Sequence, residues 1–257
     1  MKRKKAFNKI LIFVFSIVCV AICVFVAQFF ASVLTIGTLE VSSNSGNNFS
    51  EFKVYAISLG NYSTKSSAES TAVSYRQKNA GGYVLKVNGS YHIIASAYEK
   101  ENDAKLVQEN LSKESQNSQI IVINFDEVDL ENISSNPQEK EFIDSLGIFK
   151  IVYLKLYDIS VSLDTKVVDE TKAKIEIISI KAEVEGRLEK IKRGTTTVDG
   201  IYYQIIKNKY NQIIDVLNDL KNYEESDGII LSAKIKYTYI YILDMAKDLI
   251  SALNNEI

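Results

Sequence analysis

Residues 52–60 read FKVYAISLG, and the alternation of their side chains predicts the first strand of a sheet. Val54 and Ala56 fall on one face of this strand, whereas Tyr55 and Ile57 fall on the other. A period of two residues is typical of a half-buried strand, because successive side chains point to opposite faces. The stretch therefore predicts that a module containing a β-sheet begins near residue 52.

The segments that follow predict the element order β-α-β-β-α-β. Ala68, Ala72 and Tyr75 have helical spacing, and serines that can cap a helix precede them. Asn88 and Gly89 separate two apolar runs, and this dipeptide favours the tight turn of a β-hairpin. After the first strand, the predicted elements are helices at 66–76 and 101–113 and strands at 83–87, 91–97 and 119–125.

The two halves of this module resemble each other. Tyr62 is followed by Ala68 and Tyr98 by Ala104, with the same spacing in each half. Each alanine lets its helix lie close to the sheet, and each tyrosine can cover the corner between strand and helix. A duplicated strand–helix–strand unit is expected to form one antiparallel sheet with both helices on one side. The other side of the sheet would then be free to bind a ligand.

Two motifs carry a resemblance to a known family. Residues 55–62, YAISLGNY, resemble the first-strand motif of SPOR domains, in which an aromatic residue precedes a polar residue, a glycine and a second aromatic residue. Residues 91–98, YHIIASAY, resemble the third-strand motif of the same family. With the element order and the internal repeat, the resemblance covers residues 52–125. It implies a module that binds peptidoglycan glycan strands stripped of their stem peptides.

The resemblance also implies a binding site on the open face of the sheet. Carried over position by position, the family's glycan contacts fall on Ser58, Asn61 and His92. Ser58 stands where the family usually has Gln, and His92 stands where it usually has Arg. Because His92 alternates with the apolar Ile93, we expect it to project from the exposed face. The sequence leaves open whether His92 contacts a ligand or only solvent.

The amino-terminal part of the chain has the pattern of a membrane anchor. Residues 10–36 are almost continuously apolar and long enough to cross a bilayer as one helix. The basic segment 1–9 precedes them, which predicts that the amino terminus stays in the cytoplasm. The alternative is a cleaved signal peptide, whose apolar core is usually about 7–15 residues long. The polar stretch 37–50 is predicted to be a flexible linker.

The second half of the chain is predicted to be helical. A polar linker at 127–136 leads to Asn136 and Pro137, a capping residue followed by a proline at the first helical position. Apolar residues then recur at helical spacing, which predicts an antiparallel helical bundle at 137–257. The sequence leaves open whether residues 137–193 form one helix or two, because neither Gly nor Pro separates their two apolar stripes.

Composition and charge exclude several classes of function. Residues 126–257 carry 17 Lys and Arg against 24 Asp and Glu, whereas nucleic-acid binding needs clustered positive charge. His92 is the only histidine, and both cysteines, Cys19 and Cys23, lie in the apolar run. We therefore expect neither a metal site nor a cofactor. Phosphate-binding and nucleophile motifs are also missing, so we predict that the protein is not an enzyme.

The predicted fold class is α+β. It comprises an N-terminal transmembrane helix at 10–36, a SPOR-like β-α-β-β-α-β domain at 51–126 with a four-stranded antiparallel sheet, and an all-α helical bundle at 137–257. The predicted function is that of a bacterial envelope protein, anchored in the cell membrane by a single pass with its C-terminal domains outside the cytoplasm. It would bind denuded peptidoglycan glycan strands, in cell division or sporulation, at the septum. The alternative is a structural or interaction protein that binds a protein partner through its helical bundle.

Overall fold

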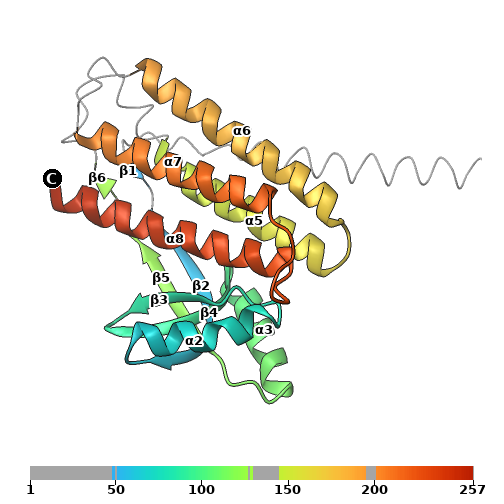
Figure 1. The fold of residues 1–257 in the computed structure, drawn as a ribbon. Coiled ribbons are helices and arrows are strands. Elements are labelled where there is room, and N and C mark those ends of the chain that lie inside the picture. The colour runs from blue at the N-terminus through green and yellow to red at the C-terminus, as the bar shows by residue number, and fades with distance from the viewer. Residues whose placement is uncertain (1–47, 50, 127, 130–144, 195–200, 257) are drawn as a thin grey trace, which may run out of the picture. The chain divides into compact units, whose positions relative to one another are not determined.

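A computed structural model describes residues 48–49, 51–126, 128–129, 145–194 and 201–256 of the chain (Figure 1). These residues belong to one compact unit, Asn47–Ile257. The strands are β1 (Asn48–Phe49), β2 (Phe52–Tyr62), β3 (Tyr83–Val87), β4 (Ser90–Tyr98), β5 (Gln119–Phe125) and β6 (Val128–Asp129). The helices are α2 (Lys65–Arg76), α3 (Glu101–Lys113), α5 (Ile148–Asp164), α6 (Glu170–Gly194), α7 (Ile201–Lys221) and α8 (Leu231–Glu256).

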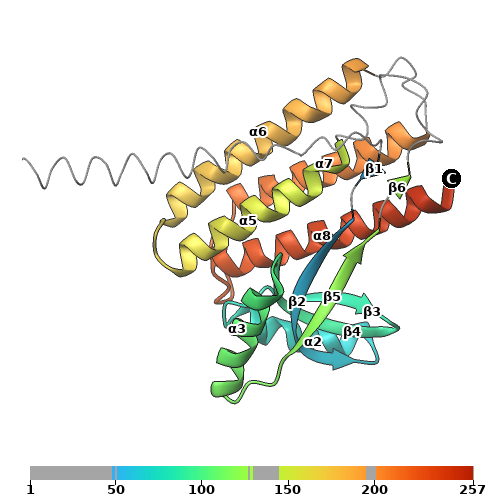
Figure 2. The ribbon, with the colours of Figure 1, turned by 180° about the vertical axis from the view of Figure 1, so that it is seen from behind.

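Four strands form an antiparallel sheet in the order β3-β4-β2-β5 (Figure 2). The first of them in sequence, β2, lies inside the sheet between β4 and β5, as in a split β-α-β-β-α-β motif. The whole of β5 pairs with β2, from Phe125 opposite Phe52 to Gln119 opposite Ser58. The prediction of a four-stranded antiparallel sheet is therefore confirmed. The short strands β1 and β6, within the predicted linkers, form a separate antiparallel pair.

Helices α2 and α3 cover one face of the sheet. Thr64 caps α2, because its Oγ1 accepts a hydrogen bond from a backbone N–H of the first turn at 3.3 Å. Ala68 and Ala72 are fully buried and pack with Val84 and Ile93 of the sheet. The small alanine side chains allow this close approach, as the sequence repeat predicts.

The opposite face of the sheet is covered in large part by the C-terminal helices, chiefly α8. Leu85 and Ile94 belong to a hydrophobic core that continues into α5, α6, α7 and α8. Figure 1 shows α8 lying over the sheet on the side away from α2. The hydroxyl of Tyr153 on α5 donates a hydrogen bond to the carbonyl oxygen of Ala97 on β4 at 3.1 Å. The expectation of a free second face is therefore wrong where these helices pack against it.

The sequence left open whether the first part of the helical half is one helix or two, and the structure shows two, α5 and α6. Helix α5 ends at Asp164 and α6 begins at Glu170. Between them, Lys166 has a φ of 58°. This left-handed conformation stops α5 and redirects the chain, although the position holds no glycine. The described part of residues 137–193 therefore forms two helices.

The predicted fold class is wrong, although the four-stranded sheet that it includes is present. Within the described ranges, no helix is both long and apolar enough to cross a membrane. The segments 1–9, 10–36 and 136–137, on which the predicted anchor and helix start depend, lie outside the described residues. The sheet and the helices also share one core, whereas the sequence predicts them as successive domains.

Gly81 provides a test of the close contact between α8 and the sheet. A Cβ atom at Gly81 would lie 2.9 Å from Cδ1 of Ile240 and 3.1 Å from the backbone carbon of Lys236, both on α8. We expect Gly81→Ala to lower the free energy of unfolding by about 1–3 kcal/mol, as overpacking does. The control is Gly186→Ala on α6, because no atom lies within 4 Å of its Cβ position. Urea unfolding should leave this control at or above parent stability. Equal effects of the two substitutions would contradict the close contact.

Candidate functional site

The structure brings together the three residues that the sequence predicts as a binding site. Ser58 and Asn61 lie on β2, and His92 lies on the neighbouring strand β4. Asn61 and His92 are direct partners across the two strands, so their side chains leave the sheet on the same face. Oγ of Ser58 lies 3.2 Å from Nδ1 of His92. Two strands thus place hydroxyl, amide and imidazole groups side by side.

A β-bulge in β2 positions these side chains. Ser58 is opposite Ile94 and Asn61 is opposite His92, so two residues of β2 span one residue of β4. Such a bulge bends the strand and changes the direction of its side chains. The hydroxyl of Ser58 donates to the carbonyl oxygen of Gly60 within the bulge at 3.1 Å. The irregular backbone thereby fixes the hydroxyl next to the imidazole.

Sequence reasoning missed a fourth residue, Gln119. It is the first residue of β5 and lies opposite Ser58. Its Nε2 is 3.1 Å from Nδ1 of His92. The amide that the SPOR pattern would place at position 58 is therefore present on the neighbouring strand. The signal was the register between β2 and β5, which pairs residues far apart in sequence. We call Ser58, Asn61, His92 and Gln119 the polar cluster.

Two members of the polar cluster are buried and two are exposed. His92 is only 7% exposed and Ser58 only 1%, whereas Asn61 and Gln119 are exposed. The expectation that His92 projects freely from the sheet is wrong. Its ring lies on the same face as Leu85, its partner on β3, and this face is buried together with the core. The cluster therefore has a buried base and an exposed rim.

The buried imidazole is electrically neutral under ordinary conditions. Burial lowers the pKa of His92, because desolvation disfavours the charged ring. Nδ1 of His92 contacts both Nε2 of Gln119 and Oγ of Ser58, and the tautomer of the ring decides which group donates in each contact. The polar cluster offers hydroxyl, amide and N–H groups without a net charge.

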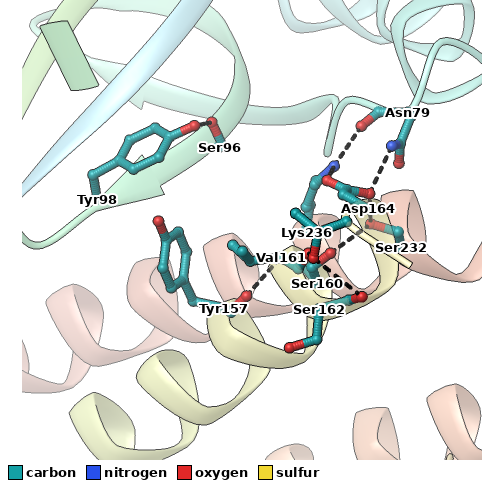
Figure 3. Close-up of polar contacts among 11 residues, drawn as sticks. Asn79, Ser96, Tyr98, Tyr157, Ser160, Val161, Ser162, Asp164, Ser232 and Lys236 are labelled. Carbon is teal, nitrogen blue, oxygen red and sulfur yellow. Dashed lines mark hydrogen bonds and ion pairs between the residues drawn. The ribbon is translucent and has the colours of Figure 1, made fainter. Parts of the chain in front are cut away.

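A second group of polar side chains joins the sheet unit to the helices (Figure 3). It consists of Asn79, Asp164, Ser232 and Lys236, and we call it the Asp164 network. The carboxylate of Asp164 accepts hydrogen bonds from Lys236 and Ser232 at 2.6 Å each and from Asn79 at 2.8 Å. Nζ of Lys236 also donates to the carbonyl oxygen of Asn79 at 2.9 Å. The network therefore connects α5, α8 and the loop after α2.

The charge state of Asp164 follows from these contacts. Burial by itself would raise its pKa, but the hydrogen bonds from Lys236, Ser232 and Asn79 outweigh burial and lower it. The side chain of Lys236 is only 11% exposed, so its charge is held next to the carboxylate away from most solvent. Two of its hydrogen bonds, from Asn79 to Asp164 and from Lys236 to Asn79, join the loop after α2 to the helices, and the other two join α8 to α5. We therefore interpret it as a structural contact rather than a ligand site.

A third polar contact fixes the far edge of the sheet to α8. The hydroxyl of Tyr83 on β3 donates to Oδ2 of Asp244 at 2.6 Å. Burial, and then the hydrogen bond to Asp244, raises the pKa of Tyr83, and burial raises the pKa of Asp244. Tyr83 also meets the ring of Tyr237 at 5.2 Å between centroids. An aromatic side chain that could have stacked on a ligand is thus engaged by the protein's own helix.

A hollow of about 510 Å³ lies between α6 and α7, away from the polar cluster. It is lined by Glu183, Arg187, Lys190 and Tyr210, among others. Glu183 already pairs with Arg187 at 3.0 Å and with Lys155 at 2.6 Å. None of the predicted site residues lines this hollow. In the part of the chain that the structure describes, no group of His, Cys, Asp and Glu side chains could hold a metal ion.

No protein-family model, curated protein or solved structure matches this chain. The resemblance of residues 52–125 to SPOR domains, with the ligand that it implies, therefore stays a prediction.

Because His92 is the only histidine, NMR can follow its ionisation without ambiguity. We expect a titration midpoint below the ordinary value of 6.5, because burial disfavours the charged ring. The ¹⁵N shifts of the ring identify the nitrogen that carries the proton of the neutral form. A midpoint at or above 6.5 would contradict the buried environment described above.

The same shift predicts how stability depends on pH. The unfolded chain takes up a proton on His92 near pH 6.5, whereas the folded chain does so only at lower pH. The contribution of the neutral His92 to the free energy of unfolding is therefore complete above pH 6.5. It decreases as the pH falls from 6.5 towards the pKa of the folded chain. His92→Gln should reduce the loss of unfolding free energy between neutral and mildly acidic pH, measured by urea unfolding.

A double-mutant cycle on Asp164→Asn and Lys236→Met tests the Asp164 network. The side chains are 31% and 11% exposed, so we expect a coupling of about 0.5–3 kcal/mol in unfolding free energy. The control cycle uses Glu101 and Lys105, an exposed pair on α3 with side chains 49% and 54% exposed. Its coupling should be smaller, because water screens it. Equal couplings would show that the network does not stabilise the junction.

Proposed function

We propose that the protein is a non-enzymatic binding protein of the cell envelope, and that the polar cluster binds a neutral, hydroxyl-rich chain. The resemblance of residues 52–125 to SPOR domains favours glycan strands of peptidoglycan as that ligand. The proposal places the cluster outside the cytoplasm, where such strands lie.

One observation carries this proposal: polar side chains from three different strands meet on a sheet face that is otherwise apolar. Ser58, His92 and Gln119 are linked by contacts of 3.1–3.2 Å around one imidazole nitrogen. A buried polar group is costly unless it is hydrogen-bonded, and the contacts among Ser58, His92 and Gln119 offset that cost. Neutral donors and acceptors suit sugar hydroxyl and acetamido groups better than phosphates or metal ions.

The exposed rim would make the first contacts. The side-chain amides of Asn61 and Gln119 can each donate and accept hydrogen bonds, and both are exposed. Ser58 and His92 lie beneath them, where they fix the orientation of Gln119. A hydrogen bond contributes only about 0.5–1.5 kcal/mol net, so we expect weak binding of a single sugar. Repeated units along a strand would raise the apparent affinity through multiple contacts.

The coverage of the sheet favours a second candidate function. Because α8 occupies much of the face opposite α2, the area left for a glycan is small. The helices meanwhile expose apolar side chains around the start of α6, at Val167 (64% exposed), Ile175 (61%) and Ile178 (46%). The protein could therefore act as a structural or interaction protein through its helices, with no glycan ligand.

Binding of the full-length chain to isolated sacculi separates these two functions. We expect more capture on sacculi treated with amidase, which exposes denuded glycan, than on untreated sacculi. Asn61→Ala with Gln119→Ala should reduce this capture at least about tenfold, because the exposed hydrogen-bonding groups are removed. The control is Asn102→Ala with Asn208→Ala, which removes exposed amides from α3 and α7 instead.

The three possible outcomes of the sacculus-binding experiment support different conclusions. Selective loss of capture in the cluster variant supports glycan binding at the polar cluster. Equal capture by both double variants would place the glycan site elsewhere, and no capture by the parent chain would leave the interaction function as the better proposal.

A further inference from the structure

Strand β5 forms one edge of the four-stranded sheet that the structure describes. Strand β5 ends the sheet order β3-β4-β2-β5, and no other described strand pairs with its far side (Figure 2). A strand at the edge of a sheet carries backbone N–H and C=O groups that can pair with another strand. Proteins usually protect such edges with charged residues, proline, bulges or very short strands.

The two edges of this sheet differ in that protection. Strand β3 is short and carries the exposed Lys86 next to its last residue. Strand β5 reads QIIVINF, with neither charge nor proline nor glycine, and pairs with β2 in continuous register without a bulge. Its sequence is rich in β-branched residues, which favour strand pairing. The edge formed by β3 therefore has a charged residue that disfavours pairing with another strand, whereas the edge formed by β5 has none.

Val122 marks the middle of the edge formed by β5. It is the central residue of Gln119–Phe125 and is 46% exposed. Its neighbours Ile121 and Ile123 face the other way and pack with the core. An apolar side chain exposed at the centre of an uncharged edge strand is typical of a strand that a partner covers.

We propose that β5 pairs antiparallel with β5 of a second copy of this chain, about a two-fold axis at Val122. This pairing joins two copies through the same surface, as a two-fold interface requires. It places Ile121 opposite Ile123 of the second copy and Val122 opposite its own counterpart. The flanking charge of Asp126 falls opposite Ser118, so no like charges meet. The antiparallel pairing therefore brings no like charges together.

The oligomeric state of the full-length chain tests the pairing. Analytical ultracentrifugation should detect a dimer, and Val122→Lys should raise its dissociation constant at least about tenfold, because two lysines then face each other. Leu106→Lys is the control, since Leu106 is 58% exposed but lies on α3. A monomer at all concentrations, or a dimer that Val122→Lys leaves unchanged, would overturn the proposal.

Cross-linking tests the register itself. In a chain with Cys19 and Cys23 replaced by serine, Val122→Cys should form a disulfide between copies, because directly opposite residues lie about 4.5–5.5 Å apart at Cα. Asn124 is also exposed, but two Asn124→Cys side chains would lie about 13 Å apart along the strands and should not cross-link. A mixture of Asn124→Cys and Ile120→Cys chains should cross-link. Equal cross-linking of Val122→Cys and Asn124→Cys alone would exclude this register.

Discussion

The burial of both faces of the sheet is the constraint on which the rest of the structure depends. Strand β4 shows it most directly, because the consecutive residues Ile93 and Ile94 point to opposite faces and are both completely buried. Helices α2 and α3 cover the face of Ile93, but they cannot reach the face of Ile94. The chain must therefore supply a second cover, and α8 provides it. The close approach at Gly81 and the Asp164 network both follow from that requirement.

This arrangement determines what remains for a ligand. Helix α8 contacts the sheet from Tyr83 at one edge, and Ile240 lies against the start of β3. The polar cluster occupies the same face, but two of its members, Asn61 and Gln119, stay exposed. In an isolated sheet this whole face could bind a ligand. Here only the exposed rim of Asn61 and Gln119, above the buried and neutral His92, remains accessible. Specificity at such a rim depends on hydrogen bonds rather than on area.

The sequence predicted the sheet well because the relevant signals are local. Alternation in residues 52–60, the Asn88–Gly89 turn and the repeated alanines each depend on neighbouring residues only. The coverage by α8 was missed, although the adjacent Ile93 and Ile94 break the alternation and indicate a strand buried on both faces. Gln119 could not be found in the same way, because its place beside Ser58 depends on the pairing of distant strands.

The sequence predicts the sheet and the helices as successive domains, whereas the structure packs them around one core. Helical periodicity shows that a helix has an apolar face, but it does not show which partner buries that face. In α5, that face includes Tyr153, which reaches across to Ala97 of the sheet. The transmembrane prediction concerned residues 10–36, which lie outside the described residues.

The shared core also limits how this protein can change during evolution. A gene fragment that ends near residue 126 would encode a sheet with Val54, Ile94 and Ala97 facing water, although all three are completely buried here. Exposed apolar surface of this kind promotes aggregation. The β-α-β-β-α-β unit is thus not a portable module, and recombination that moves it to another protein would have to carry its helices with it.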